Sequence, residues 1–156
     1  MNLNGIDQTD INILNLIQTD ARLTNKEIAC KTNKSLSAIQ VRIKKLISQG
    51  IVKRYVTLVD RMRIDKRLAV FTTIKLSNYQ QHALLEFQES ASAFMEVMEC
   101  YHVSGDRDFI LKIVIRDMIE YNAFILEKLS TLPHIASVES LFVISESKYE
   151  TAFNLK

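Results

Sequence analysis

The residues of this chain whose types and spacing could do chemistry are cations. Seven Lys and Arg residues lie between Ile28 and Val59, and no acidic residue interrupts them. Within this stretch, Ser35–Gly50 repeats apolar residues at helical spacing and carries its cations largely outside the apolar stripe. A helix of this kind can bury one face in a core and offer the other face to the phosphates and base edges of nucleic acid.

Individual side chains on and beside this helix are suited to contact double-stranded DNA. Ser37 and Gln40 could hydrogen-bond base edges, and Lys44 could contact guanine or phosphate. Two positions have a structural alternative, because Val41 could belong to the core and the stem of Arg42 could pack on the first helix. The candidate DNA-binding residues are Lys34, Ser35, Ser37, Gln40, Val41, Arg42, Lys44, Lys45, Lys53 and Arg54.

The charge of the chain is divided unevenly between its two parts. Residues 1–60 hold nine Lys or Arg against five Asp or Glu, a net charge of +4, whereas residues 61–156 hold eleven against thirteen, a net charge of −2. A basic module joined to a mildly acidic one indicates a polyanion-binding part attached to something else. The alternative is a solvated basic face with no function.

Two shorter helices are expected before the basic helix. The first extends from about Asp7 to Thr19. The second follows Thr24, which forms a capping-box pattern with Glu27. Asn33 can turn the chain into the basic helix because it tolerates left-handed backbone. This order predicts a helix-turn-helix, although an ordinary three-helix bundle would share the same apolar spacing.

After Gly50 the chain is rich in β-prone residues. Ile51–Val59 predicts a short strand pair, or wing, with Lys53 and Arg54 at its tip or edge, where cations commonly touch phosphate. A charged connector, residues 61–67, follows and contains no Gly, Pro or Ser, which indicates a structured hinge.

Strand and helix patterns alternate in the remainder of the chain. Their order is β-α-β, a short turn, then β-α-β, which predicts a ferredoxin-like α+β domain with an antiparallel sheet and two helices on one face. Phe109–Ile115 is apolar on both faces, so we expect the second sheet face to pack on another subunit. The expected elements are the strands Leu68–Leu76, Val97–Val103, Phe109–Ile115 and Ile135–Ser145, and the helices Tyr79–Ser92 and Met118–Leu132.

Composition and motif content disfavour several classes of protein. The chain has no run of about 18 apolar residues that would span a membrane, and its polar first residues do not predict a signal peptide. Cys30 and Cys100 stand far apart, which favours free thiols in the cytoplasm over a disulfide or a zinc site. No catalytic set, metal-ligand spacing or phosphate loop is visible, so we expect no enzymatic activity, no metal and no cofactor.

A series of short motifs runs through almost the whole chain. In the first half these are Ile6-Asp7, Asp10, Ile13-Leu14, Gln18, Asp20–Thr24, Glu27–Ala29, Ser35–Ser37, Val41–Leu46, Gly50–Val52 and Tyr55. In the second half they are Cys100–Asp106, Asp108, Lys112 and Leu132-Pro133. Each motif alone has low specificity, but in this order and spacing they resemble the Lrp/AsnC family, the feast/famine transcriptional regulators of bacteria and archaea.

The resemblance implies a winged helix-turn-helix in residues 1–60, a hinge in 61–67, and an effector-sensing and oligomerisation domain in 68–156. It also implies homodimers that assemble into octamers or similar discs, and a small effector, usually an amino acid. The effector site implied by the resemblance comprises the turn after the second strand of that domain and the residues facing it: Tyr101, His102, Ser104, Gly105, Asp106, Asp108, Pro133 and His134.

The chemistry of this turn suits a zwitterion. Backbone N–H groups around Gly105 can hold a carboxylate, and Asp106 or Asp108 can hold an ammonium group. The alternative is that Gly and Asp simply form a hairpin turn, which both residues favour. Arg107 stands between the two acids and could pair with them.

Two other functions are compatible with the same architecture. Sirohaem decarboxylases resemble the family in overall architecture, and an enzyme of that kind could use His102, which lies near the Gly105 turn. A stand-alone amino-acid sensor would lack DNA binding, and the uninterrupted basic stretch argues against it. We therefore expect a sequence-specific, DNA-binding transcriptional regulator of the cytoplasm whose assembly and DNA binding respond to a small effector.

Overall fold

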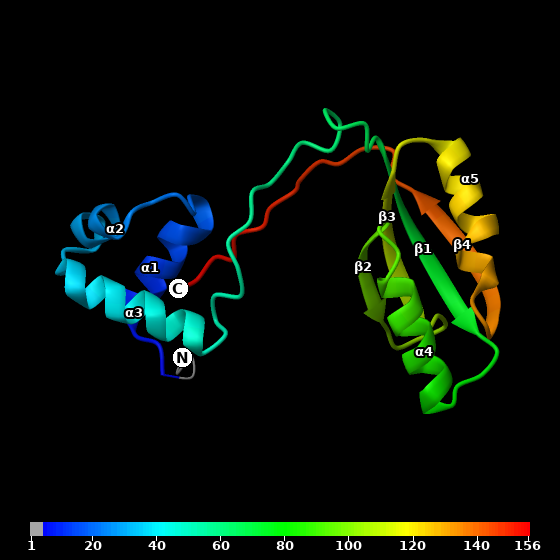
Figure 1. The fold of residues 1–156 in the computed structure, drawn as a ribbon, viewed down its shortest axis with the longest axis horizontal. Coiled ribbons are helices and arrows are strands. Elements are labelled where there is room, and N and C mark those ends of the chain that lie inside the picture. The colour runs from blue at the N-terminus through cyan, green and yellow to red at the C-terminus, as the bar shows by residue number, and fades with distance from the viewer. Residues whose placement is uncertain (1–4) are drawn as a thin grey trace. The chain divides into compact units, whose positions relative to one another are not determined.

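A computed structural model describes residues 5–156 of the chain. These residues form two compact units (Figure 1). The first unit comprises the chain up to Leu58 together with Lys148–Lys156, and the second comprises Val59–Ser147. The expected second domain, 68–156, had included the last nine residues, which the structure places in the first unit.

Three helices make up most of the first unit, and each follows a residue with a capping side chain. They are α1 (Gln8–Thr19), α2 (Asn25–Thr32) and α3 (Leu36–Ser48). Asp7 and Thr24 form capping boxes, and Ser35 accepts a hydrogen bond from the Ala38 backbone N–H at 3.2 Å. The expected helix-turn-helix order is confirmed, and Asn33 makes the turn with a φ of 53°.

The three helices share one apolar core. Its buried residues are Ile13, Leu14, Ile17, Ile28, Ala29, Ile39 and Leu46. Full burial of a Leu or Ile side chain contributes about 1.5–3 kcal/mol, so this small core can hold α3 against the other two helices. Val41 is 67% exposed, so the alternative that placed its side chain in the core is wrong.

Residues 51–60 do not form the expected strand pair. Residues 51–52 form a bend and residues 53–60 have no regular secondary structure, and Tyr55 and Val56 are 50% and 57% exposed. A tight hairpin favours Gly or Asn in its turn, and Lys53 and Arg54 supply neither. The prediction that this segment forms a strand pair by itself is therefore wrong.

The segment Lys148–Lys156 belongs to the first unit because it docks on α1. The Gln18 side chain donates to the Phe153 carbonyl at 3.3 Å and accepts from the Phe153 N–H at 2.9 Å. Asn15 donates to the Leu155 carbonyl at 3.1 Å, and the Leu155 side chain packs against the apolar core. These contacts join residues 135 or more positions apart, so no local pattern predicts them.

The second unit is a four-stranded antiparallel sheet with the strand order β2-β3-β1-β4 (Figure 1). Both long helices contribute to the apolar core on one of its faces. The expected ferredoxin-like arrangement is confirmed. The elements are β1 (Leu68–Leu76), α4 (Gln81–Ser92), β2 (Val97–His102), β3 (Phe109–Ile115), α5 (Met118–Glu127), the short 3₁₀ helix η1 (Leu129–Thr131) and β4 (Ile135–Phe142).

The two faces of this sheet differ in polarity. On the helix-covered face Phe109 is fully buried, whereas Ile110 and Val114 on the other face are only partly buried. That second face also carries an ion pair, in which Lys112 lies 2.8 Å from Glu99, so it is less apolar than the strand pattern predicted. We call it the open face. By strand register it is lined by Phe71, Thr73, Lys75, Glu99, Tyr101, Ile110, Lys112, Val114, Ser137, Glu139 and Leu141.

Candidate nucleic-acid interface and effector region

One stripe of α3 is exposed and carries the side chains expected to read DNA. This reading stripe consists of Ser37, Gln40, Val41 and Lys44. The spacing i, i+3, i+4, i+7 places the four side chains on one side of the helix. Hydroxyl and amide groups can hydrogen-bond base edges in the major groove, and the Val41 side chain can contact a thymine methyl group. Ile39 and Leu46 are fully buried and hold the helix on the core.

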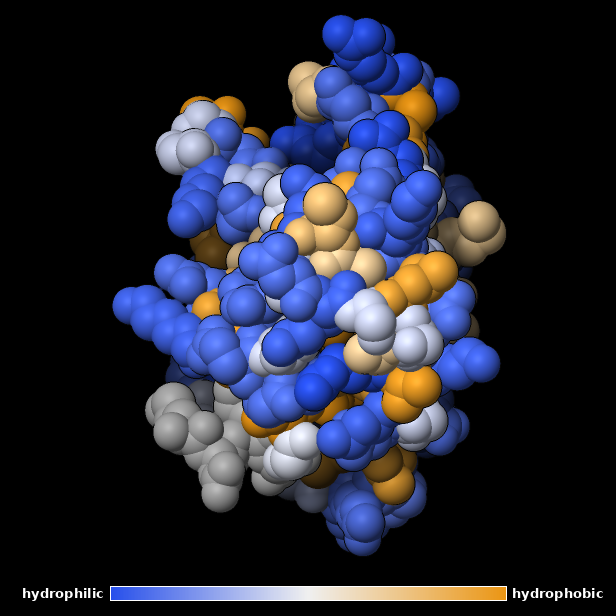
Figure 2. Space-filling view, turned by 90° about the vertical axis from the view of Figure 1, so that its left-hand side faces the viewer, coloured by the Kyte–Doolittle hydropathy of each residue, from blue (hydrophilic) through white to orange (hydrophobic). Residues whose placement is uncertain are grey.

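Several of the other DNA-binding candidates are exposed at the molecular surface. Figure 2 shows a predominantly hydrophilic surface on which apolar side chains are scattered rather than gathered into one patch. Lys34, Lys53 and Arg54 are exposed, as phosphate contacts must be. Ser35 is exposed as well, but its hydroxyl caps α3 and lies 3.2 Å from the Ser37 hydroxyl. Ser35 therefore has a structural role in addition to the expected one.

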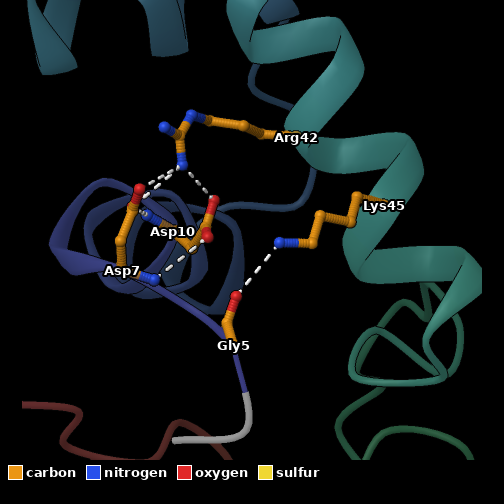
Figure 3. A network of polar contacts seen from close by, with 5 residues as sticks. All are labelled: Gly5, Asp7, Asp10, Arg42 and Lys45. Carbon is orange, nitrogen blue, oxygen red and sulfur yellow. Dashed lines mark hydrogen bonds and ion pairs between the residues drawn. The ribbon is translucent and has the colours of Figure 1, made fainter. Parts of the chain in front are cut away.

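Two other cations of α3 are directed towards the protein, Arg42 towards the start of α1 and Lys45 towards Gly5, which precedes that helix (Figure 3). The Arg42 Nη1 atom lies 2.8 Å from both carboxylate oxygens of Asp7 and 2.8 Å from Asp10 Oδ1. One turn later, Lys45 Nζ donates to the Gly5 carbonyl at 3.0 Å. In this structure Arg42 and Lys45 thus bind protein groups, and Arg42 lies against the start of the first helix, as one of its two expected alternatives had it.

Hydrogen bonds in this cluster favour the ionised form of its exposed members. The pKa of Asp7 is lowered, first by the hydrogen bond from the Asp10 backbone N–H and then by the Arg42 guanidinium. The pKa of Arg42 is raised by its hydrogen bonds to Asp10 and then to Asp7. Asp7 and Arg42 therefore both stay charged at neutral pH. The Asp10 side chain is 2% exposed, and Arg42 is its counter-charge.

In the second unit, Asp108 fixes the turn between β2 and β3 to the end of β1. The Asp108 carboxylate accepts from the Leu76 backbone N–H at 2.7 Å, and the Asp108 N–H donates to the Ile74 carbonyl at 2.9 Å. Ser104–Asp106 are exposed, and Gly105 has a φ of 130°, which only Gly adopts readily. Asp108 therefore has a structural role, and the acid that the turn presents to solvent is Asp106.

Arg107 joins this turn to β4 and does not pair with the acids on either side of it. Its guanidinium donates to Ser137 Oγ at 3.0 Å and to Glu139 Oε2 at 2.6 Å. Lys75, on the intervening strand β1, lies 3.4 Å from Asp106. Two cations and two carboxylates thus gather at one end of the open face. We call Lys75, Asp106, Arg107 and Glu139 the charge quartet.

Tyr101 and His102 lie on opposite faces of β2. On the open face, the Tyr101 hydroxyl donates to the Glu99 carboxylate at 2.6 Å, and this hydrogen bond raises the pKa of Tyr101. The His102 ring stacks on Phe109, with 4.9 Å between ring centroids and 25° between the ring planes. Successive residues of a strand point to opposite faces, so the structure does not bring these two candidates together.

Pro133 and His134 precede β4 and lie near the same end of the sheet as Asp108. Ile135, the first residue of β4, pairs with the last residue of β1, whose N–H binds Asp108. His134 has a φ of 67°, and its carbonyl accepts from the Ser77 N–H at 2.8 Å. The backbone of His134, rather than its ring, therefore has a defined contact.

Sequence reasoning missed Lys75 and Glu139 as members of the effector region. Each is a charged residue within a β-prone run, LAVFTTIKL and IASVESLF. A charge inside a strand that is buried on one face has to point to the other face. That signal could have placed both residues on the open face, but it does not tell which turn they meet.

Within residues 5–156, no group of three or more His, Cys, Asp or Glu residues is arranged to hold a metal ion. Cys30 and Cys100 are both free thiols. The helices of this described part are all too short or too polar to cross a membrane.

Comparison with known proteins gives consistent matches along the chain. Residues 6–53 match the model of a winged helix-turn-helix DNA-binding domain, and residues 69–153 match the Lrp/AsnC ligand binding domain. The transcriptional regulator AzlB of Bacillus subtilis is 35% identical over 143 residues, which cover 92% of this chain and 91% of the relative.

Two solved structures share the whole architecture. A crystal structure of an AsnC family transcriptional regulator from Agrobacterium tumefaciens superposes with a TM-score of 0.91 at 32% identity, covering 96% of this chain and 97% of the other. A transcriptional regulator from Neisseria meningitidis, crystallised in complex with L-Met, superposes with a TM-score of 0.90 at 30% identity and covers 96% of both chains.

Proposed function

The chain belongs to the Lrp/AsnC family of DNA-binding transcriptional regulators, and from this premise we propose that an amino acid controls its assembly and its binding to DNA. The observation that carries the proposal is the pairing of two sites on one chain. The first unit exposes a reading stripe on α3, and the second unit presents a charge quartet beside the Gly105 turn.

In the first unit, α3 acts as the recognition helix. Ser37 and Gln40 read base edges in the major groove, Val41 contacts a methyl group, and Lys44 binds guanine or phosphate. Lys34, Lys53 and Arg54 hold the DNA backbone. We propose residues 1–60 as the DNA-binding domain, to which the docked segment Lys148–Lys156 is added. Residues 61–67 are the proposed hinge to the sensing domain.

In the second unit, the charge quartet and the Gly105 turn recognise the two charged groups of an amino acid. Arg107 and Lys75 offer cations for the carboxylate, while Asp106 and Glu139 offer oxygens for the ammonium group. In the quartet each cation is paired with a carboxylate. A bound zwitterion can replace one of these pairs by pairing its carboxylate with the cation and its ammonium group with the acid, so that no charge is left unpaired. The L-Met complex of the Neisseria relative supports an amino acid as the class of effector.

Assembly links the two sites. We propose that the open face packs on a second copy, because it exposes Phe71 and Leu141, which are 36% and 57% exposed. Dimers formed in this way then assemble into an octamer or a similar ring. An effector shifts such an assembly only through a difference in its affinity for the assembled states. The spacing of the recognition helices changes with the assembly, and so does DNA binding.

A regulator of this kind works in the cytoplasm without a cofactor, and we assign it no catalytic activity. The alternative of a sirohaem-decarboxylase-like enzyme has a direct test. Purified protein mixed with a tetrapyrrole would show a Soret absorption band that resists gel filtration, whereas a regulator leaves the tetrapyrrole unbound.

The proposal is tested by thermal-shift screening with each proteinogenic amino acid, followed by DNA-binding measurements with any amino acid that stabilises the protein. Binding to the native state raises the melting temperature by mass action. We expect one or a few amino acids at millimolar concentration to raise it and to change the affinity for DNA. No shift with any amino acid would contradict the effector proposal. DNA binding that is insensitive to salt would contradict the phosphate contacts.

A further inference from the structure

We infer that Arg42 is a positioning residue, which sets the angle at which α3 presents its reading stripe to DNA. The inference rests on the proposed function, because it concerns how α3 reads DNA. It gives Arg42 a role different from the phosphate contact that a basic helix predicts. The role follows from what the guanidinium and its two acidic partners contact.

The Arg42 guanidinium is anchored at three oxygen atoms. Its Nη1 atom lies 2.8 Å from each Asp7 carboxylate oxygen and 2.8 Å from Asp10 Oδ1 (Figure 3). The Arg42 side chain is 30% exposed, and that of Asp10 is 2% exposed. A carboxylate removed from water needs a counter-charge, so Asp10 holds Arg42 more firmly than an exposed acid would.

The anchor is itself fixed within α1. Asp7 Oδ1 accepts from the Asp10 N–H at 3.0 Å, and the Asp7 N–H donates to Asp10 Oδ2 at 3.1 Å. This capping box orients both carboxylates independently of Arg42. The pairing therefore connects a rigid helix start to the middle of α3, 32 to 35 positions further along the chain.

A second contact fixes the same edge of α3. Lys45 follows Arg42 by three residues, so the two side chains lie on one edge of the helix, and Lys45 Nζ binds the Gly5 carbonyl at 3.0 Å. Two contacts spaced along one edge resist a swing of the helix about either contact, whereas one contact alone would act as a pivot. Base readout tolerates errors of only about 10–20°, so this resistance keeps Ser37 and Gln40 in reach of base edges.

The test uses the full chain and two DNA duplexes of equal length. One is recovered by in vitro selection from a random library with the wild-type protein, and the other has a random sequence. Dissociation constants are measured by fluorescence anisotropy over a KCl series for Arg42→Gln, Asp10→Asn and the double variant. Circular dichroism checks that each variant is folded at the assay temperature.

Two further variants serve for comparison. Lys34→Gln represents the loss of a phosphate contact. Arg22→Gln is the matched control for a lost positive charge, since Arg22 pairs with Asp20 on the surface.

We expect Arg42→Gln to weaken binding to the selected duplex at least about tenfold and to reduce the preference over the random duplex. The slope of log K against log [KCl] stays unchanged. Asp10→Asn weakens binding to the selected duplex to a similar extent, even though it removes a negative charge. The double variant binds this duplex no more weakly than whichever single variant binds it less tightly. Lys34→Gln instead reduces the magnitude of this slope by about 0.9 and weakens binding to both duplexes equally.

Two results would overturn the inference while leaving the proposed function intact. One is a salt slope whose magnitude is smaller by about 0.9 in Arg42→Gln, together with equal losses of affinity for both duplexes. That combination is the result expected for a phosphate contact. The other is unchanged or tighter binding by Asp10→Asn, because a released Arg42 would then serve DNA. If Arg42→Gln is unfolded at the assay temperature, the change in DNA affinity of Asp10→Asn decides. Weaker binding supports the inference, and unchanged or tighter binding contradicts it. Failure of the wild-type protein to enrich any duplex would overturn the proposed function, and this inference with it.

Discussion

The side-chain amide of Gln18 pairs with the backbone of Phe153 in both directions, as a neighbouring strand would. Through this pairing the end of the chain becomes part of the first unit. The unit is therefore joined covalently to the second unit twice, after Leu58 and before Lys148.

Removal of the Leu155 side chain should loosen α1. Leu155 is partly buried against the core of the first unit, and we expect Leu155→Ala to lower the free energy of unfolding of this unit by about 1 kcal/mol. Hydrogen exchange should speed up for α1 amides and stay constant in the sheet of the second unit. Asn154→Ala, at an exposed neighbouring position, is the matched control. Unchanged exchange in α1 would mean that the tail does not dock.

Loss of the Arg42 charge should destabilise the first unit more strongly. Arg42→Met leaves the buried Asp10 carboxylate without its counter-charge, and we expect a loss of about 2–4 kcal/mol. Arg42→Met combined with Asp10→Leu should recover part of that loss, because no buried charge then remains unpaired. Differential scanning calorimetry of the full chain measures both. Equal stability of Arg42→Met and the wild-type protein would argue against the pairing.

Local signals were sufficient to predict most elements of this fold. Periods of 3.6 and 2 residues depend only on which side of an element is buried, and they located the three first helices and the strands. The cap of α2 followed from Thr24 and Glu27, three residues apart. The exposed positions of Ser37, Gln40 and Lys44 followed from the same helical period, whereas that period left Val41 open between the core and the surface.

Contacts between distant segments could not be predicted in this way. Arg42 binds acids more than 30 residues earlier, Arg107 binds Glu139 on another strand, and the tail binds α1. Each depends on which elements the fold brings together, and one sequence contains no record of that. The prediction of a strand pair after Gly50 failed for a different reason. β-prone residues indicate an extended backbone, but they do not identify a pairing partner, and residues 51–60 have none in this structure.

The stability of the second unit should fall in acid because of Glu99. Hydrogen bonds from Lys112 and then from Tyr101 lower the pKa of Glu99. A carboxylate whose pKa is lower in the folded state adds stability above its unfolded pKa, and this stability is lost as the pH falls through the folded pKa. We expect the free energy of unfolding to be flat near neutral pH and to decrease below about pH 4.5.

Glu99→Gln separates this contribution from that of other acids. The variant should be less stable than the wild-type protein at pH 7, and the difference should shrink as the pH falls through the lowered pKa of Glu99 in the folded state. Urea titrations of the two proteins at several pH values measure the difference. A constant difference across that range would exclude an ionic contribution from Glu99.

The proposed effector response should depend on Arg107. Its guanidinium bridges the Gly105 turn to Ser137 and Glu139, and it is the best-placed cation for a carboxylate because it can bind two oxygens at once. We expect Arg107→Gln to weaken binding of a stabilising amino acid at least about tenfold, since a charge-assisted hydrogen bond contributes about 1.5–3 kcal/mol. Isothermal titration calorimetry measures the affinity.

Arg107→Lys tests whether charge or geometry matters at this position. Lys keeps the charge but loses the planar pair of donors, so binding should remain weaker than in the wild-type protein and stronger than in Arg107→Gln. Arg116→Gln is the matched control, because Arg116 is exposed, follows β3 and pairs with Asp117 rather than with the charge quartet. An affinity for the amino acid that is the same in Arg107→Gln and Arg116→Gln would move the effector site away from the charge quartet.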